Sequence, residues 1–195
     1  MRHRFASFGL LLTFVLCVAA APRADAQSLA ETIKKNPGRS PEWIAETAKV
    51  SRDEAVKALV AGYRIPVDGG KFDEVWTKLT TWENPLLITI VAGSVIEVHS
   101  KIPKGKYDQG FFNLEDGASL TGHFKPENIK MIYIIEEPSR EGGVARQVAF
   151  YDADAKRVFG IFVDRKESGG EHYPGTLAQF KELQEFYRKQ VAGKS

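Results

Sequence analysis

The sequence predicts an α+β protein, in which a run of antiparallel strands is flanked by helices. Near both ends of the chain, over residues 28–60 and 176–190, apolar residues recur at helical spacing. Between them, over residues 86–163, short runs rich in Val, Ile, Phe and Tyr alternate with Gly, Pro, Asn and Asp. Such runs are typical of strands joined by turns, and their closeness along the chain favours hairpins.

The opening helices are recognised by their ends. Asn36-Pro37-Gly38 closes a first short helix. Ser40 followed by Pro41 offers the next helix an N-cap and a proline at its first position. Ser51 and Glu54 form a capping box for a third helix. Short helices joined by tight turns resemble a helix-turn-helix, but no basic stripe accompanies them, so we expect a packing appendage.

One further helix and a series of strands follow. Residues 66–70 are interpreted as a turn or linker, and residues 71–82 as a helix that ends before Asn84-Pro85. The expected strands, in chain order, cover 86–91, 95–99, 110–114, 119–124, 129–135, 146–151 and 157–163. An amphipathic helix closes the chain over 176–190, and its apolar side holds Leu177, Phe180, Leu183, Phe186 and Tyr187.

The first 26 residues have the composition of a secretory signal peptide. Arg2 and Arg4 precede an apolar run over 10–19, and Ala24-Asp25-Ala26 has the A-x-A pattern of a cleavage site. We therefore expect cleavage after residue 26 and a periplasmic or secreted protein. An uncleaved membrane anchor is the alternative, although the apolar run is short for a membrane span.

The rest of the chain, residues 27–195, is expected to form one domain, with a helical part over 27–65 and a helix, the sheet and the closing helix over 71–191. The signal segment holds three of the 27 Lys and Arg and one of the 25 Asp and Glu, so 24 basic and 24 acidic residues remain. This balance argues against a nucleic-acid binder. Cys17 is the only cysteine and leaves with the signal segment, which excludes disulfides and thiolate chemistry.

Candidate chemical groups are few. The sequence has no nucleophile elbow, no phosphate-binding glycine loop and no paired-cysteine metal site. His99, His123 and His172 are the histidines beyond the signal segment, and their scatter gives little support to a zinc site. His123 follows Gly122 inside an expected strand, where a glycine often marks the close approach of a ligand. A half-buried histidine bonded to a neighbour is the simpler interpretation.

Three short motifs, which follow one another in a fixed order along the chain, resemble those of a known protein family. Pro103 to Gly105 has the form P-x-G, Gly110 to Leu114 the form G-x-F-N-L, and Leu120 to His123 the form L-x-G-H. With the segment from Trp76 to Val98, they resemble the HutX/ChuX family of haem utilisation carriers over residues 29–190. The resemblance implies a curved antiparallel sheet of the HemS/ChuX type and, commonly, a homodimer.

The resemblance also implies where haem would bind. His123 matches the family's glycine-preceded haem histidine, whereas Ile90 replaces a second histidine and Phe111 replaces a frequent tyrosine. Tyr107 and His99 are the candidate substitutes as iron ligands. The candidate pocket walls are Phe111, Phe112, Ile90 and Met131, and the candidate propionate contacts are Lys104, Lys106 and Arg146, with Lys101 as a further cation. Ordinary core packing and solvated loops are the alternative explanations for these residues.

The expected function is therefore that of a non-catalytic haem-trafficking protein of haem uptake, with haem as cargo. Its expected partners are haem donor or acceptor proteins and a second copy of the chain, without nucleic acid and without a membrane span after signal cleavage. One alternative is a protein of the same fold that binds another apolar ligand or a protein partner. An enzyme that modifies a tetrapyrrole is a weaker alternative, because no acid–base constellation supports it.

Overall fold

The computed structural model describes residues 24–115, 119–139 and 142–193. Residues 1–23 of the predicted signal peptide and the expected turn at Asp116-Gly117 lie outside these ranges. Helix α1 (Ala24–Lys35) includes the predicted cleavage position, so the boundary after residue 26 remains a prediction. Within the described ranges, no helix has the length and apolarity that crossing a membrane requires.

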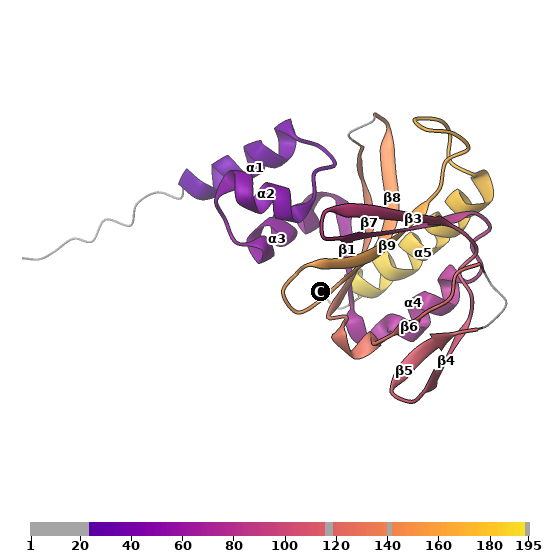
Figure 1. Ribbon diagram of the computed structural model, residues 1–195. Coiled ribbons are helices and arrows are strands. Elements are labelled where there is room, and N and C mark those ends of the chain that lie inside the picture. The colour runs from indigo at the N-terminus through magenta and orange to yellow at the C-terminus, as the bar shows by residue number, and fades with distance from the viewer. Residues whose placement is uncertain (1–23, 116–118, 140–141, 194–195) are drawn as a thin grey trace, which may run out of the picture.

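Three helices form a lobe at the N-terminal end of the molecule (Figure 1). Helix α1 is followed by α2 (Pro41–Ala48) and α3 (Arg52–Tyr63), and the predicted caps are confirmed. The Ser40 hydroxyl accepts a hydrogen bond from the Trp43 amide, and the Ser51 and Glu54 side chains each accept one from the other residue's amide. The lobe has its own small apolar cluster, with Leu29, Ile44, Ala45 and Ala55 buried.

A six-stranded antiparallel sheet forms the body of the molecule, with the spatial order β1-β7-β8-β9-β2-β3. In chain order its strands are β1 (Arg64–Asp68), β2 (Pro85–Val91), β3 (Ser94–His99), β7 (Met131–Pro138), β8 (Val144–Tyr151) and β9 (Arg157–Val163). The predicted hairpins β2–β3 and β8–β9 are confirmed. The α+β class with an open curved sheet and a closing helix is confirmed as well.

The interpretation of residues 66–70 as a turn or linker is wrong. Pro66 and Val67 belong to β1, where Pro66 pairs with Tyr133 of β7. Strand β1 is the end strand of the sheet, and an end strand tolerates a proline because the missing N–H has no strand to bond on its outer side. A short 3₁₀ helix, Gly69–Lys71, follows and leads into α4.

Helices cover both faces of the sheet. On β7, Ile132 and Ile134 face the main core with α4 (Phe72–Leu79) and α5 (Pro174–Ala192), whereas Tyr133 and Ile135 face α3. This alternation follows from the two-residue period of a strand. The prediction for α5 needs one correction, because Phe186 is 39% exposed and packs beneath the Lys78 ammonium rather than in the core.

A second, three-stranded sheet lies beside α4 and carries β4 (Gly105–Asp108), β5 (Phe111–Leu114) and β6 (His123–Phe124) (Figure 1). Strand β4 was not expected, because Gly105 follows Pro103-Lys104 and the segment has the composition of a turn. Gly105 is needed there, since a Cβ at this position would collide with the ring of Phe112. Strand β6 is shorter than the expected strand 119–124, and His123 is its first residue.

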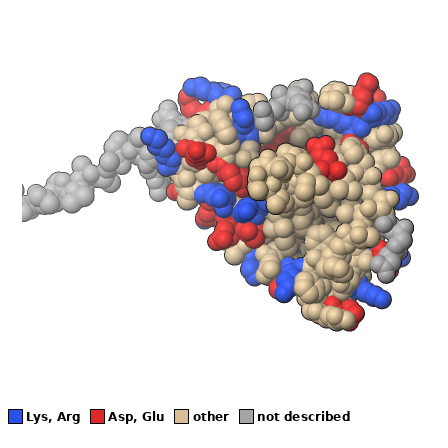
Figure 2. Space-filling view, in the orientation of Figure 1, with Lys and Arg blue, Asp and Glu red and all other residues tan. Residues whose placement is uncertain are grey.

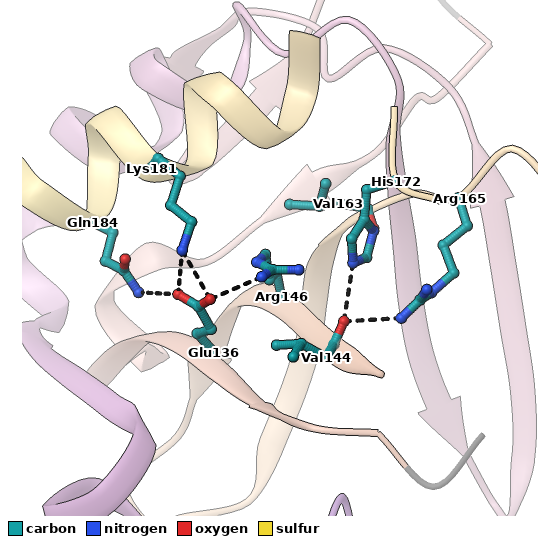
Figure 3. Close-up of polar contacts among 8 residues, drawn as sticks. All are labelled: Glu136, Val144, Arg146, Val163, Arg165, His172, Lys181 and Gln184. Carbon is teal, nitrogen blue, oxygen red and sulfur yellow. Dashed lines mark hydrogen bonds and ion pairs between the residues drawn. The ribbon is translucent and has the colours of Figure 1, made fainter. Parts of the chain in front are cut away.

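A charged network fastens α5 to the sheet (Figure 3). The Glu136 carboxylate accepts hydrogen bonds from Lys181 at 2.7 and 2.8 Å, from Gln184 at 2.9 Å and from Arg146 at 2.9 Å. Burial raises the pKa of Glu136, but the bonds from Lys181 and Gln184 and the charge of Arg146 outweigh it and lower the pKa to about 2.

Replacing Glu136 by glutamine is expected to lower the free energy of unfolding by about 1–3 kcal/mol at neutral pH, because charged hydrogen bonds are lost. A carboxyl whose pKa is lower in the folded protein than in the unfolded chain stabilises the fold fully at pH values above its unfolded-state pKa. This stabilisation is lost as the pH falls through the folded-state pKa. The difference between wild type and variant should therefore vanish between pH 4.5 and about 2 in urea titrations. The exposed Glu182→Gln is the control, and a pH-independent difference at residue 136 would contradict the assignment.

Candidate functional site

The small sheet places three predicted or newly found site residues side by side. Lys106 of β4 is paired in register with Asn113 of β5, and Asn113 is paired with His123 of β6. Residues directly opposite each other in an antiparallel sheet extend from the same face. Lys106, Asn113 and His123 therefore form one row across the sheet, and His123 is exposed to solvent.

His123 has well-defined partners on this face. Its Nδ1 lies 2.5 Å from Oδ1 of Asn113, and its ring meets the edge of Phe111 with the centroids 6.1 Å apart. The Lys125 ammonium lies 4.9 Å from the centroid of Phe111. Phe111 is 36% exposed, so the surface combines an imidazole, an accessible aromatic ring and cations from Lys106 and Lys125.

The opposite face of the small sheet belongs to the core. Phe112 is 6% exposed and packs against Phe72 and Trp76, and Phe124 packs against Trp76 at 5.3 Å between centroids. Phe112 therefore does not share the face of His123, although it lines a hollow with Lys104 and Tyr107 on the opposite side of the small sheet. The cause is strand alternation, since Phe111 and its neighbour Phe112 must face opposite sides.

Tyr107 lies on the same face of the small sheet as Phe112, away from His123, and is itself 58% exposed. Its ring packs against Phe112 at 5.3 Å, and its hydroxyl donates a hydrogen bond of 2.7 Å to Asp73 of α4. Burial, followed by the hydrogen bond to Asp73 and its charge, raises the pKa of Tyr107 to about 12. Tyrosine binds iron as the phenolate, so this arrangement disfavours Tyr107 as a ligand.

A Tyr107→Phe variant is consequently expected to bind haem with the spectrum and affinity of the wild type. The change removes the hydroxyl but keeps the ring that packs on Phe112. Absorption titrations of the two proteins provide the measurement. An altered Soret maximum in Y107F would return Tyr107 to the ligand candidates.

The other histidines lie on the six-stranded sheet or in the loop that follows it. His99 ends β3, and its Nδ1 lies 2.8 Å from Oδ2 of Asp164. Both ring nitrogens of His172 face main-chain carbonyls, with Nδ1 2.9 Å from Val163 and Nε2 2.9 Å from Val144 (Figure 3). His172 therefore fastens its loop to the sheet and is not placed for a ligand. In the described parts of the chain, no group of three His, Cys, Asp or Glu could hold a free metal ion.

The remaining predicted contacts are not gathered around His123. Arg146 is paired with Glu136, and its side chain is only 16% exposed beneath α5, which disfavours it as a propionate contact (Figure 3). Lys104 lines a hollow beside Asp73 and Tyr107 on the core side of β4. Lys101 lies in the segment that connects β3 to β4, and its side chain is exposed.

Two predicted wall residues belong to the large sheet. Ile90 is 43% exposed near the end of β2, and Met131 begins β7 and packs under α3 against the cluster around Tyr133 and Tyr151. Neither is joined to His123 by a contact found among the described residues. Lys106 and Phe111 are the two predicted contacts that share its face.

Sequence reasoning missed two residues of this face, Asn113 and Lys125. A signal for both was present, because each lies two positions from a residue that had been selected. Asn113 follows Phe111 by two, and Lys125 follows His123 by two, and residues at this spacing share a strand face.

Comparisons with known proteins agree on one family. Residues 65–183 match the family described as Haem utilisation ChuX/HutX. The "Intracellular heme transport protein HutX" of Vibrio cholerae is 31% identical over 165 residues, which are 84% of this chain and 84% of that protein. Two solved structures of ChuX, one described as the heme binding protein ChuX, superpose with TM-scores of 0.72 and 0.68 at 26% and 28% identity. They cover 83% and 80% of this chain and 98% and 96% of their own.

A more distant solved structure resembles this chain in its fold alone. The heme degrading enzyme ChuS of Escherichia coli O157:H7 superposes with a TM-score of 0.64 at 14% identity, over 84% of this chain and 49% of that one. This likeness supports the curved-sheet architecture of the HemS/ChuX type.

The expected periplasmic or secreted location is corrected by these comparisons. The HutX relative, which matches 84% of the chain, is named as an intracellular transport protein. The prediction depended on an apolar run and an A-x-A pattern in a segment that precedes the matched fold.

Proposed function

Because the chain belongs to the ChuX/HutX family of haem utilisation proteins, we propose that it binds haem through His123 and carries it as cargo. The observation that carries this proposal is the exposed imidazole of His123, whose Nδ1 is held by Asn113. With Nδ1 engaged in this way, Nε2 is the nitrogen that is left to coordinate iron. A histidine holds the haem iron in globins and peroxidases.

The residues around His123 suit the other parts of haem. Phe111 offers an accessible ring beside the imidazole for contact with the macrocycle. Lys125 and Lys106 offer ammonium groups on the same face for the two propionates. Because these residues are exposed, a second protein could reach haem bound here and receive it.

We propose further that haem leaves this protein chemically unchanged. The named relatives at 26–31% identity are a transport protein and a heme binding protein. Haem donor and acceptor proteins would then be its functional partners. If ascorbate and oxygen were to convert the bound haem to a product without a Soret band, the protein would instead be a tetrapyrrole-modifying enzyme.

Titration of the purified protein with haem tests the proposal. A saturable Soret band at one haem per chain is expected, and its absence would contradict haem binding at this site. A second apolar tetrapyrrole without iron, such as protoporphyrin IX, separates coordination from simple apolar adsorption. Iron coordination by His123 predicts that haem binds more tightly than the metal-free ring.

The free edge of the large sheet supports a homodimer as part of the proposal. Strand β3 ends the sheet, and the β2–β3 hairpin exposes Val91 by 56%, Val95 by 58% and Ile96 by 47%. Charged side chains are sparse over this part of the surface and gather over α1–α3 (Figure 2). Apolar surface on an unpaired edge favours association.

Light scattering is expected to give the mass of two chains for the wild type. Replacing Ile96 by lysine should shift the protein to the 21.7 kDa monomer, because a buried ammonium at the edge opposes pairing. The matched control is Val191→Lys at a 39% exposed position of α5, which should remain dimeric. A monomeric wild type would contradict the homodimer.

A further inference from the structure

We infer that Asn113 is a positioning residue that holds the imidazole of His123 as its Nδ1–H tautomer and so directs the Nε2 lone pair outward to iron. The consequence for haem rests on the function proposed above. The tautomer itself is a property of the protein without haem, so the two can be tested separately.

The first step concerns the orientation of the Asn113 amide. Its Nδ2 lies 3.0 Å from the carbonyl oxygen of Asp108 and 3.0 Å from that of Phe111. Carbonyl oxygens only accept hydrogen bonds, so the NH₂ group must face them. Turning the amide over would bring Oδ1 against both carbonyls and lose two hydrogen bonds. The orientation is therefore determined by the main chain of the β4–β5 hairpin.

The second step follows for His123. With the NH₂ group facing the hairpin, Oδ1 is the atom of Asn113 that lies 2.5 Å from Nδ1. An amide oxygen can only accept, so Nδ1 must carry the proton and donate it. In a neutral imidazole the other nitrogen, Nε2, then carries the lone pair. A metal-binding histidine is commonly fixed in this way by a partner on its second nitrogen.

The chemistry of the partner also matters. A carboxylate partner fixes the same tautomer and adds a negative charge, which makes the ring more basic. His99 has such a partner in Asp164. Asn113 fixes the tautomer of His123 without that charge.

The hairpin turn supports the amide. Gln109 and Gly110 have φ values of 50° and 79°, which define the tight two-residue turn between β4 and β5. The two carbonyls that hold Asn113 flank this turn. A rigid turn thus fixes the amide, the amide fixes the imidazole, and the exposed ring keeps one orientation without being buried.

Two-bond proton–nitrogen correlation spectra of the haem-free protein test the inference directly, since they distinguish the protonated nitrogen of each histidine. We expect His123 to be Nδ1–H in the wild type. In Asn113→Ala we expect a mixture of both tautomers. The signals of His99 and His172 report on folding in the same spectrum, and Asn128→Ala, an exposed change in the adjacent 3₁₀ helix Pro126–Asn128, is the matched control.

Haem titration gives the functional readout. Asn113→Ala should weaken haem binding by roughly 10–100-fold, the usual effect of losing the partner of a metal-binding histidine, whereas Asn128→Ala should not. An Nε2–H tautomer in the wild type, or an unchanged tautomer in Asn113→Ala, would overturn the inference. Should Asn113→Ala fail to fold, the tautomer of His123 in the wild type decides alone, and an Nε2–H ring there would overturn the inference. A protein in which Asn113 controls the tautomer but haem does not bind would reject the proposed function and leave the positioning role intact.

Discussion

Replacing His123 by alanine is expected to remove the Soret band that haem acquires on binding to this protein, while the far-UV circular dichroism stays that of the wild type. His123 is exposed on a two-residue strand, so its loss leaves no cavity in the core. The loss in haem affinity should exceed the roughly 10–100-fold that is usual for a partner of a metal ligand, because the ligand itself is removed. Titration of both proteins with haem provides the measurement.

Two further results would accompany this one. Coordination needs a neutral imidazole, so the affinity of the wild type for haem should weaken as the pH falls toward ~5. His99→Ala is the matched control, because the His99 side chain is 63% exposed and lies on the other sheet. An unchanged spectrum in H123A together with an altered one in H99A would move the iron ligand to His99.

Most of the fold could be predicted because its elements carry local signals. The caps at Ser40 and Ser51, the hairpin between β2 and β3 and the apolar side of α5 all depend on residues that are near one another in the chain. Strands β1 and β4 could not be predicted in this way. Their sequences contain Pro66 and Gly105, which usually mark turns, and they become strands only because β7 and β5 pair with them.

The site could be predicted in part for a related reason. The glycine-histidine motif identified His123, and two-residue spacing would have added Asn113 and Lys125. The sequence could not reveal that Asp73, 34 residues earlier in the chain, accepts a hydrogen bond from the hydroxyl of Tyr107. Nor could it reveal that the pairing of β7 with β8 joins Arg146 to Glu136. Such partners are set by packing between distant segments.

The second large effect that we expect is a loss of stability on replacing Trp76, because this residue joins the small sheet to the core. Its side chain is 1% exposed and meets Phe112 of β5, Phe124 of β6 and Phe159 of β9, with ring centroids 5.3–6.3 Å apart. Its Nε1 donates a hydrogen bond of 2.9 Å to the carbonyl of Pro103, immediately before β4. All three strands of the small sheet are therefore held through this residue.

Replacing Trp76 by alanine should lower the free energy of unfolding by about 3–5 kcal/mol, as is usual when a large buried aromatic ring is removed. Urea titration measures this as a lower midpoint with an unchanged slope. Trp76→Phe restores part of the packing but leaves the Pro103 carbonyl without its donor, so an intermediate loss is expected. Trp43→Ala, a half-buried tryptophan of α2 beneath Arg39, is the matched control and should cost less.

The same variant also tests how the site depends on the core. Phe112 and Phe124 are the chain neighbours of Asn113 and His123, so loosening their packing should disturb the row of residues on the outer face. Trp76→Ala should therefore weaken haem binding even at temperatures where the protein remains folded, whereas Trp43→Ala should leave it unchanged. Full haem affinity in a folded Trp76→Ala protein would mean that the small sheet keeps its geometry without the tryptophan. The hairpin turn and the Asn113 amide would then be sufficient to hold His123 in place.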